Sequence, residues 1–324
     1  MPDLSAIKTA IAPELKVFES EFKSIMRSKI PLLNIVTNYV IRRKGKQMRP
    51  MFVFLTARLL GEVTPATYIA AALIEILHTA TLIHDDVVDD SRERRGFLSI
   101  NAIWKSKIAV LVGDYLLSRG LLLAVNNKQY ELLDIVSNAV KEMSEGELLQ
   151  IQKSRKLNLT EEQYYEIIRK KTAALIASCT ACGAKSVSAE DEVVEQLWKF
   201  GEYVGMAFQI KDDLLDYHDR NIIGKPTGND IKEKKLTLPL IYVLSNNNKP
   251  DSRKILRLIS NNHKNSKNIG EVIDFVKKNG GIEYSQNKMV EYRNKALDII
   301  AGYPDSDIKK SLIELVNFTT TRTV

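Results

Sequence analysis

Apolar residues recur at helical spacing along almost the whole chain, and this pattern constrains the fold more than any other feature of the sequence. Runs of β-branched residues with the length of a strand are scarce. The pattern therefore predicts an all-α protein. The expected helices cover residues 4–28, 31–43, 49–60, 65–89, 100–125, 129–153, 160–182, 189–217, 235–245, 251–261, 269–279, 281–302 and 306–320.

The length of 324 residues, 44% of them hydrophobic, allows one large core, and we expect a single domain over residues 1–324. Its long helices should form the core, with a more polar helical cap from about residue 240 onward. The longest apolar run, residues 66–83, contains Glu75 and His78, so it predicts a buried helix rather than a membrane span. No basic leader precedes an apolar stretch and a cleavage site, so we expect a cytoplasmic protein.

The formal net charge of +7 fits anionic ligands of several kinds. The basic residues form short clusters without the interleaved aromatic residues of a strand-binding groove, so we expect no nucleic acid partner. The two cysteines, Cys179 and Cys182, have the spacing of a redox pair or of half a zinc site. Because they lie in a helical stretch of small residues, we interpret both as compact core residues.

Four carboxylates follow an apolar helical run within Leu82 to Asp90, and such crowding is costly without cations. On a helix, Asp85 and Asp89 share a face because they are four residues apart, so both can reach the same metal ions. Mg²⁺ suits such a site, since it takes one or two carboxylates and completes its shell with water and substrate phosphate. The cluster predicts a magnesium site at this helix end.

A second cluster repeats the D-D-x-x-D spacing at Asp212, Asp213 and Asp216, again at the end of an apolar helical stretch. One acidic helix end is often only a solvated cap, but two with identical spacing favour a shared function. If the clusters face each other across a cavity, they can hold a diphosphate through bridging metal ions. Basic residues near each cluster supply further anion binding, since the planar fork of arginine suits bidentate contact with phosphate.

These motifs resemble the trans-isoprenyl diphosphate synthase family, and most of all its long-chain polyprenyl branch, over nearly the whole chain. Asp85 to Gly96 matches the first aspartate-rich motif of the family with its arginine pair, and Gln209 to Tyr217 matches the second. The resemblance implies the isoprenoid synthase fold, a bundle of long antiparallel helices around a central cavity. It also implies a homodimer and about two or three Mg²⁺ ions per active site, for which Mn²⁺ is expected to substitute.

The resemblance further implies individual roles. Isopentenyl diphosphate would be bound by Lys46, Arg49, His78 and Arg95, and the allylic diphosphate by Arg94, Lys171, Thr172, Gln209, Lys225 and Lys235. Magnesium would be held by Asp85, Asp89 and Asp212, while Asp86, Asp213 and Asp216 would ligate it through water or orient the ligands. Two motifs depart from the usual family pattern, at Lys44 to Pro50 and at Glu233 to Thr237, but both keep their charged anchors.

The activity implied by the resemblance is repeated head-to-tail addition of isopentenyl diphosphate to an allylic diphosphate. Ionisation of the allylic diphosphate needs charge stabilisation of the leaving group, and the resulting cation needs an apolar pocket that excludes water. In the family that the motifs resemble, bulky aromatic residues one turn before the first aspartates favour short products, so the small Ala80 and Thr81 imply products of about C30 to C40. The floor of the pocket is expected near Leu73, Ile76, Leu77 or a leucine of 121–123. We also expect transient membrane contact when so apolar a product is released.

Other functions remain as alternatives. A shorter-chain geranylgeranyl or farnesyl diphosphate synthase would use the same motifs. A class I terpene cyclase shares the ionisation step but has no need of the isopentenyl anchors, and its second metal motif normally mixes Asn, Ser or Thr with Glu. A non-catalytic subunit of a two-component synthase would have no need of both aspartate clusters. A metal hydrolase built on His78 and His84-Asp85 would give the second cluster no role.

Overall fold

The computed structural model describes residues 4–42, 45–94, 96–154, 157–217, 228–262 and 265–321. Most of them are helical: α1 (Leu4–Ala10), α2 (Ala12–Ile25), α3 (Pro31–Arg42), α4 (Met48–Leu60), α5 (Pro65–Val88), α6 (Ile100–Asn126), α7 (Tyr130–Ser154), α8 (Glu161–Ile168), the π-helical turn η1 (Arg169–Ala173), α9 (Ala174–Lys185), α10 (Asp191–Leu215), α12 (Asn229–Lys232), α13 (Leu238–Asn246), α14 (Lys249–Asn262), α15 (Ser266–Lys278), α16 (Gly281–Ala301) and α17 (Asp307–Thr321). The all-α prediction is confirmed.

Local signals explain several helix boundaries. Thr64 and Thr160 each form a capping box at the start of α5 and α8. The prediction of one helix over 4–28 was wrong, because the chain breaks at Ile11 and α2 restarts with Pro13 in its first turn. The sequence reading also missed an antiparallel hairpin of β1 (Glu93–Arg94) and β2 (Phe97–Leu98), whose strands are too short to show a period.

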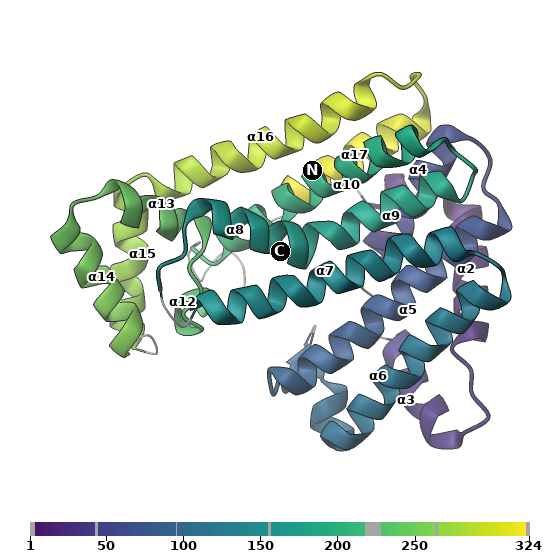
Figure 1. Cartoon of the computed structure of the whole chain (residues 1–324), viewed down its shortest axis with the longest axis horizontal. Coiled ribbons are helices and arrows are strands. Elements are labelled where there is room, and N and C mark those ends of the chain that lie inside the picture. The colour runs from purple at the N-terminus through teal and green to yellow at the C-terminus, as the bar shows by residue number, and fades with distance from the viewer. Residues whose placement is uncertain are drawn as a thin grey trace.

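The long helices pack side by side around α9, which runs through the middle of the bundle (Figure 1). Every residue from Ala174 to Ala184 is buried. Small side chains make this possible: a Cβ on Gly201 of α10 would lie 2.3 Å from Thr180 Oγ1, and one on Gly183 would lie 2.6 Å from the Val53 carbonyl oxygen of α4. The helix α9 is therefore enclosed by its neighbours on all sides.

Both cysteines lie on this enclosed helix, and neither is in a disulfide. Burial raises the pKa of Cys179 to about 12, and it also raises the pKa of Cys182. The interpretation of Cys179 and Cys182 as core residues is confirmed, because a buried and protonated thiol is a poor nucleophile and a poor metal ligand.

A second buried cluster lies beyond the main core, where α8 and the end of α10 meet α13, α14, α15 and α16. In Figure 1, α13, α14 and α15 lie together at one end of the molecule, whereas α16 runs back along α10. The helix α17 also returns to the main bundle, where it packs on α1, α4 and α10. The boundary of a C-terminal cap at about residue 240 stays a prediction.

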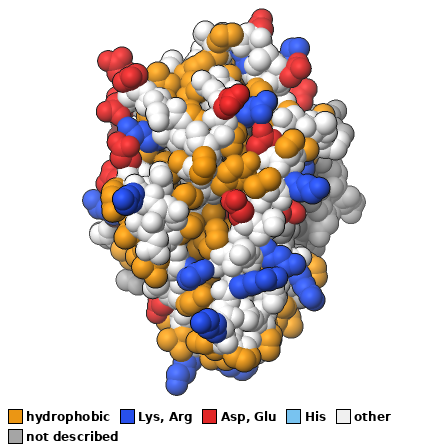
Figure 2. All heavy atoms as spheres, turned by 90° about the vertical axis from the view of Figure 1, so that its right-hand side faces the viewer, with side chains coloured by type: hydrophobic (Ala, Val, Ile, Leu, Met, Phe, Trp, Pro, Cys, Tyr) orange, Lys and Arg blue, Asp and Glu red, His pale blue; other side chains and the backbone are white. Residues whose placement is uncertain are grey.

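Two helices, α5 and α6, are long and apolar enough to cross a membrane by length and composition alone. The apolar stretch of α5 is 56% buried inside the molecule, whereas that of α6 is only 33% buried. Figure 2 shows hydrophobic side chains reaching the surface on the side where α2 lies. The exposed apolar residues of α6 include Ile103, Val110, Leu111, Leu121, Leu122 and Val125.

Candidate active site

The two aspartate clusters end α5 and α10 and line two adjoining cavities. Asp85 lines a cavity of about 460 Å³, and Asp212 and Asp213 line another of about 280 Å³. Both cavities are also lined by Lys171 and Thr172, which therefore lie between the clusters. The structure thus brings both motifs and these two polar side chains to one cleft.

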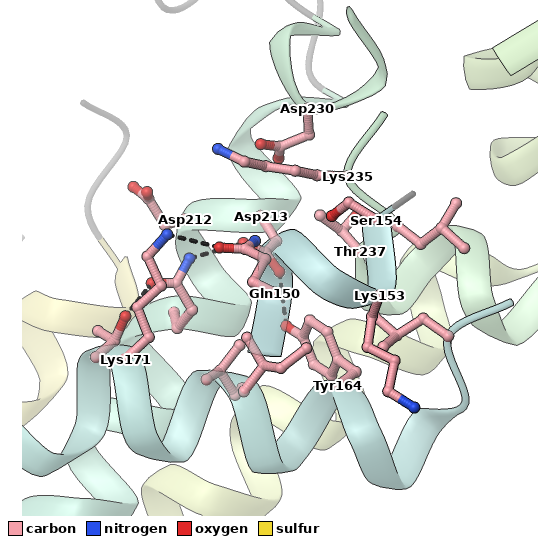
Figure 3. A pocket seen from close by; sticks show the side chains of 16 residues that line it. Gln150, Lys153, Ser154, Tyr164, Lys171, Asp212, Asp213, Asp230, Lys235 and Thr237 are labelled. Atoms are coloured by element: carbon pink, nitrogen blue, oxygen red, sulfur yellow. Dashed lines mark hydrogen bonds between the residues drawn. The ribbon is translucent and has the colours of Figure 1, made fainter. Parts of the chain in front are cut away.

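In the second cluster, two neighbouring side chains hold Asp213 (Figure 3). The Tyr164 hydroxyl donates to Asp213 Oδ2 at 2.6 Å, and Gln209 Nε2 donates to Oδ1 at 2.8 Å. Burial raises the pKa of Asp213, and the adjacent carboxylates Asp212 and Asp216 raise it further. Asp213 is therefore oriented by protein donors, while Asp212 faces the cavity.

Asp216, the last carboxylate of this motif, anchors the chain that follows. Its two oxygens accept hydrogen bonds from the backbone nitrogens of Asn229 at 2.9 Å and Asp230 at 3.0 Å. These contacts fix the segment that carries Asp230 and Lys235, and Figure 3 shows both side chains at the cavity. Burial and the neighbouring Asp213 raise the pKa of Asp230. Sequence reasoning did not select Asp230 as a site residue, although it lies in the lysine-rich segment after the second motif.

The first cluster has a similar division of roles. Asp86 is buried and accepts a hydrogen bond from Arg94 Nε at 2.7 Å, which ties the β1–β2 hairpin to the end of α5. Partial desolvation at the cleft raises the pKa of Asp85, which is still partly exposed, and nearby Glu147 raises it further, whereas Arg94 and Lys171 oppose the shift. Asp89 is exposed at the C-terminal cap of α5.

Lys171 and Thr172 lie in the π-helical turn η1, a type of irregularity that often marks functional sites. Lys171 Nζ donates to Gln150 Oε1 at 2.6 Å and forms an ion pair with Glu147. Thr172 Oγ1 donates to Gln209 Oε1 at 2.7 Å. A Cβ on Gly146 of α7 would lie 2.8 Å from the Lys171 backbone nitrogen, so this close approach requires glycine.

Of the other basic residues predicted to bind diphosphate, the structure places some at the two cavities and some elsewhere. Arg49 and His78 line the larger cavity with Asp85, and Arg49 makes a bidentate ion pair with Glu75 at 2.9 and 3.0 Å. Lys235 lines the smaller cavity and pairs with Glu233 at 2.5 Å. Lys46 Nζ lies 5.2 Å from the Phe318 ring centroid. Two further predicted anchors, Arg95 and Lys225, lie outside the described residues.

The predicted chain-length residues divide into three groups. Thr81 lines the larger cavity beside Asp85. Ala80, Ile76, Leu73 and Leu77 are buried, and a Cβ on Gly120 of α6 would lie 2.9 Å from Leu77 Cδ2 and 3.5 Å from Leu73 Cδ1. Gly120 therefore packs closely against Leu77 and Leu73, and this packing leaves no space between α5 and α6 at this point. Leu121 and Leu122 are about half exposed, so they face away from it.

Among the described residues, no three His, Cys, Asp or Glu side chains come together as a complete metal site. Asp85 and Asp212 instead reach the cleft from two different helices. Desolvation and repulsion by nearby carboxylates raise the pKa of Asp85 and Asp213. Mg²⁺ is a cation that takes only one or two carboxylate ligands and completes its shell with water and phosphate oxygens, so these carboxylates could hold it together with a phosphate ligand.

Comparison with known proteins agrees with the fold and the motifs. Residues 30–276 match the family model described as polyprenyl synthetase. The chain belongs to this family. It is 32% identical to octaprenyl diphosphate synthase of Escherichia coli K12 over 99% of both chains.

Two solved structures of the same fold are similar over almost the whole chain. A polyprenyl synthase from Caulobacter crescentus CB15, complexed with calcium and isoprenyl diphosphate, superposes with a TM-score of 0.91 at 31% identity, over 99% of this chain and 98% of that one. A geranylgeranyl pyrophosphate synthase from Bacteroides thetaiotaomicron superposes with a TM-score of 0.82 at 40% identity, over 99% of each chain. The predicted isoprenoid synthase fold is confirmed.

Several residues that hold the site were missed by sequence reasoning. Each acts through a partner far away in the chain, so no local motif reveals it. They are Glu75, Glu147, Gln150 and Tyr164. The one sequence signal for Glu147 and Gln150 is their spacing of three residues on α7, which places both side chains on the same face of the helix.

Proposed function

We propose that this protein is a Mg²⁺-dependent long-chain trans-prenyltransferase. It adds isopentenyl diphosphate repeatedly, head to tail, to an allylic diphosphate and releases diphosphate. The observation that carries this proposal is the meeting of two aspartate-ended helices, α5 and α10, at a cleft that also contains Lys171 and Thr172. The family and its relatives indicate a prenyltransferase, while the metal and the product length are inferred from the site.

Asp85, Asp89 and Asp212 would hold the metal ions, which would neutralise the charge that develops on the leaving diphosphate. Arg94, Lys171, Thr172, Gln209, Lys225 and Lys235 would bind that diphosphate, and Lys46, Arg49, His78 and Arg95 would bind isopentenyl diphosphate. The bond between the allylic carbon and the diphosphate oxygen breaks first, and the isopentenyl double bond then attacks the resulting allylic cation. A proton leaves the new adduct for the departing diphosphate, so no side-chain nucleophile is needed.

The wall of the larger cavity supports this chemistry. Phe52, Leu175, Ile176 and Phe208 line it beside the polar groups. An apolar wall of this kind excludes the water that would quench an allylic cation. In the described structure Lys171 is held by Glu147 and Gln150, so it reaches the cleft with its direction already restricted.

Thr81 and the small buried Ala80 favour a long product, because neither fills the space next to Asp85. A geranylgeranyl diphosphate synthase is the second candidate, favoured by 40% identity to such an enzyme from Bacteroides thetaiotaomicron. A cyclase or a non-catalytic subunit fits less well, since the site holds both aspartate motifs together with isopentenyl anchors.

The test is incubation with farnesyl diphosphate, labelled isopentenyl diphosphate and Mg²⁺, followed by separation of dephosphorylated products by length. Products beyond C20, absent with Asp85→Ala and after chelation of the metal, would support the long-chain proposal. A limit at C20 would favour the geranylgeranyl alternative. No elongation with several allylic primers would overturn the prenyltransferase proposal. Replacing Mg²⁺ by Mn²⁺ in the chelated enzyme tests whether Mn²⁺ substitutes.

We further propose a homodimer formed through the outer face of α6. Val110, Leu111, Leu121, Leu122 and Val125 recur at helical spacing on this face and are all more than a third exposed. A second copy would cover the same surface on both chains. Sedimentation of the wild type as a dimer, and of Leu121→Asp as a monomer, is the expected result, whereas a monomeric wild type would contradict the proposal.

The cytoplasmic location is a proposal that rests on the sequence alone. Transient membrane contact is a proposal that follows from the predicted product, because a long prenyl chain is poorly soluble in water. Enzyme loaded with product should cosediment with liposomes, while enzyme without product should stay in the supernatant. Absence of cosedimentation in both states would count against membrane contact. Cell fractionation tests the location.

A further inference from the structure

Tyr164 lines the cleft but belongs to neither aspartate motif, and the proposed chemistry does not use its hydroxyl. Tyr164 projects from α8 toward Asp213 in Figure 3, and its hydroxyl donates to Asp213 Oδ2 at 2.6 Å. Both side chains are buried. A charge-assisted hydrogen bond in such surroundings is strong and directional.

This contact is one end of a chain of hydrogen bonds across three elements. Thr172 of η1 donates to Gln209 Oε1, and Gln209 Nε2 donates to Asp213 Oδ1, both from within the cleft. Asp213 is therefore held on one oxygen by α8 and on the other by a side chain of its own helix α10. Its neighbour Asp212, which faces the cavity, lies on the same helical turn.

We propose that Tyr164 is a positioning residue for the second aspartate motif. By fixing the Asp213 carboxylate it holds the last turn of α10, and so sets the direction in which Asp212 meets the metal-bound diphosphate. Tyr164 itself touches neither substrate nor metal in this role. The inference rests on the proposed function, since it assigns Asp212 and Asp213 to the binding of metal and diphosphate.

Packing alone does not account for the hydroxyl. The Tyr164 ring belongs to the apolar cluster between α8, α10 and α13 to α16, and a phenylalanine ring would fill the same space. The adjacent Tyr165 provides a contrast on the same helix. Its hydroxyl donates to Glu161 at 3.0 Å, and Glu161 also accepts from Tyr284 at 2.6 Å, so these groups do not contact the aspartates.

The experiment compares Tyr164→Phe with the matched control Tyr165→Phe, each of which loses one hydroxyl that donates to a carboxylate. Binding of Mg²⁺ together with inorganic diphosphate is measured by titration calorimetry, and thermal unfolding is followed in parallel without metal. Loss of a group that orients a metal ligand typically weakens metal affinity by about 10- to 100-fold. We expect this loss for Tyr164→Phe and a change below about twofold for Tyr165→Phe.

A double-mutant cycle with Asp213→Asn tests whether Tyr164 acts through Asp213. In the Asp213→Asn background, Tyr164→Phe should weaken binding by less than about threefold, because the Asp213 carboxylate that Tyr164 orients is already lost and the two effects are not additive. Equal affinities of Tyr164→Phe and Tyr165→Phe, or full additivity in the cycle, would overturn the inference. The proposed function is tested separately, by elongation of prenyl chains with the wild type. Elongation by the wild type together with equal affinities of the two variants would refute only the role of Tyr164.

Discussion

The ion pair between Arg49 and Glu75 leads to a quantitative prediction about the isopentenyl site. Glu75 binds the Arg49 guanidinium through both oxygens, at 2.9 and 3.0 Å, and about a fifth of each side chain is exposed. Replacement by Gln removes the charge and one acceptor but keeps the size. Arg49 then loses the contact that directs its remaining donors toward the cavity.

A hydrogen bond to a charged group contributes about 1.5–3 kcal/mol when buried, and we take about 1–2 kcal/mol here because solvent screens the pair. Since 1.36 kcal/mol corresponds to a factor of ten, Glu75→Gln should raise KM for isopentenyl diphosphate by roughly 5- to 30-fold. KM for the allylic diphosphate should change by less than about twofold, because neither Arg49 nor Glu75 lines the smaller cavity, which contains Asp212.

Initial rates, measured with each diphosphate varied while the other is saturating, test this prediction. Glu14→Gln is the control, since Glu14 also pairs with an arginine, Arg58, through a single contact at 2.8 Å, and neither residue lines the two cavities of the site. A fall in KM for isopentenyl diphosphate would refute the reasoning, because it would mean that Glu75 competes with the substrate for Arg49. An equal rise in both KM values would also refute it.

Three further outcomes follow from the structure. Gly146→Ala places a Cβ 2.8 Å from the Lys171 backbone nitrogen, so the π-helical turn must shift and KM for the allylic diphosphate should rise by about tenfold, with a smaller change for isopentenyl diphosphate. Thr81→Phe fills the cavity next to Asp85, so product analysis should show shorter chains, and an unchanged length would place the growing tail elsewhere. Because burial raises the pKa of Cys179 to about 12, the thiol is protonated at pH 8, and a thiol reagent should modify it only after denaturation. Rapid modification of the native protein would mean that α9 opens.

Sequence reasoning placed both aspartate clusters at helix ends because helical periodicity and carboxylate spacing are local properties. It also found the starts of α5 and α8, where a threonine cap is followed by proline or glutamine. Pro13 lies inside the expected helix 4–28 and signals a break, but this break was missed because the buried apolar residues keep helical spacing across it, from Ile7 through Ile11 to Leu15. The π-helical turn η1 was also missed, because its residues do not interrupt the helical spacing of apolar residues between α8 and α9.

The partners of the site residues were beyond prediction for a different reason. Arg49 meets Glu75 across 26 residues, and Tyr164 meets Asp213 across 49. Such pairs depend on how α4 packs on α5 and how α8 packs on α10, which helical spacing alone does not specify. Sequence therefore identified the groups that carry charge into the cleft but not the groups that hold them in place.

The enclosure of α9 bears on how repeated elongation is organised. Since α9 is close-packed through glycine, alanine and cysteine, it has no room to slide, and η1 at its start carries Lys171 and Thr172. Under the proposed function, Lys171 and Thr172 would bind the allylic diphosphate at the same position in every cycle. After each addition the diphosphate of the lengthened product would have to move from the isopentenyl site to the allylic site, because η1 and α9 cannot move to meet it.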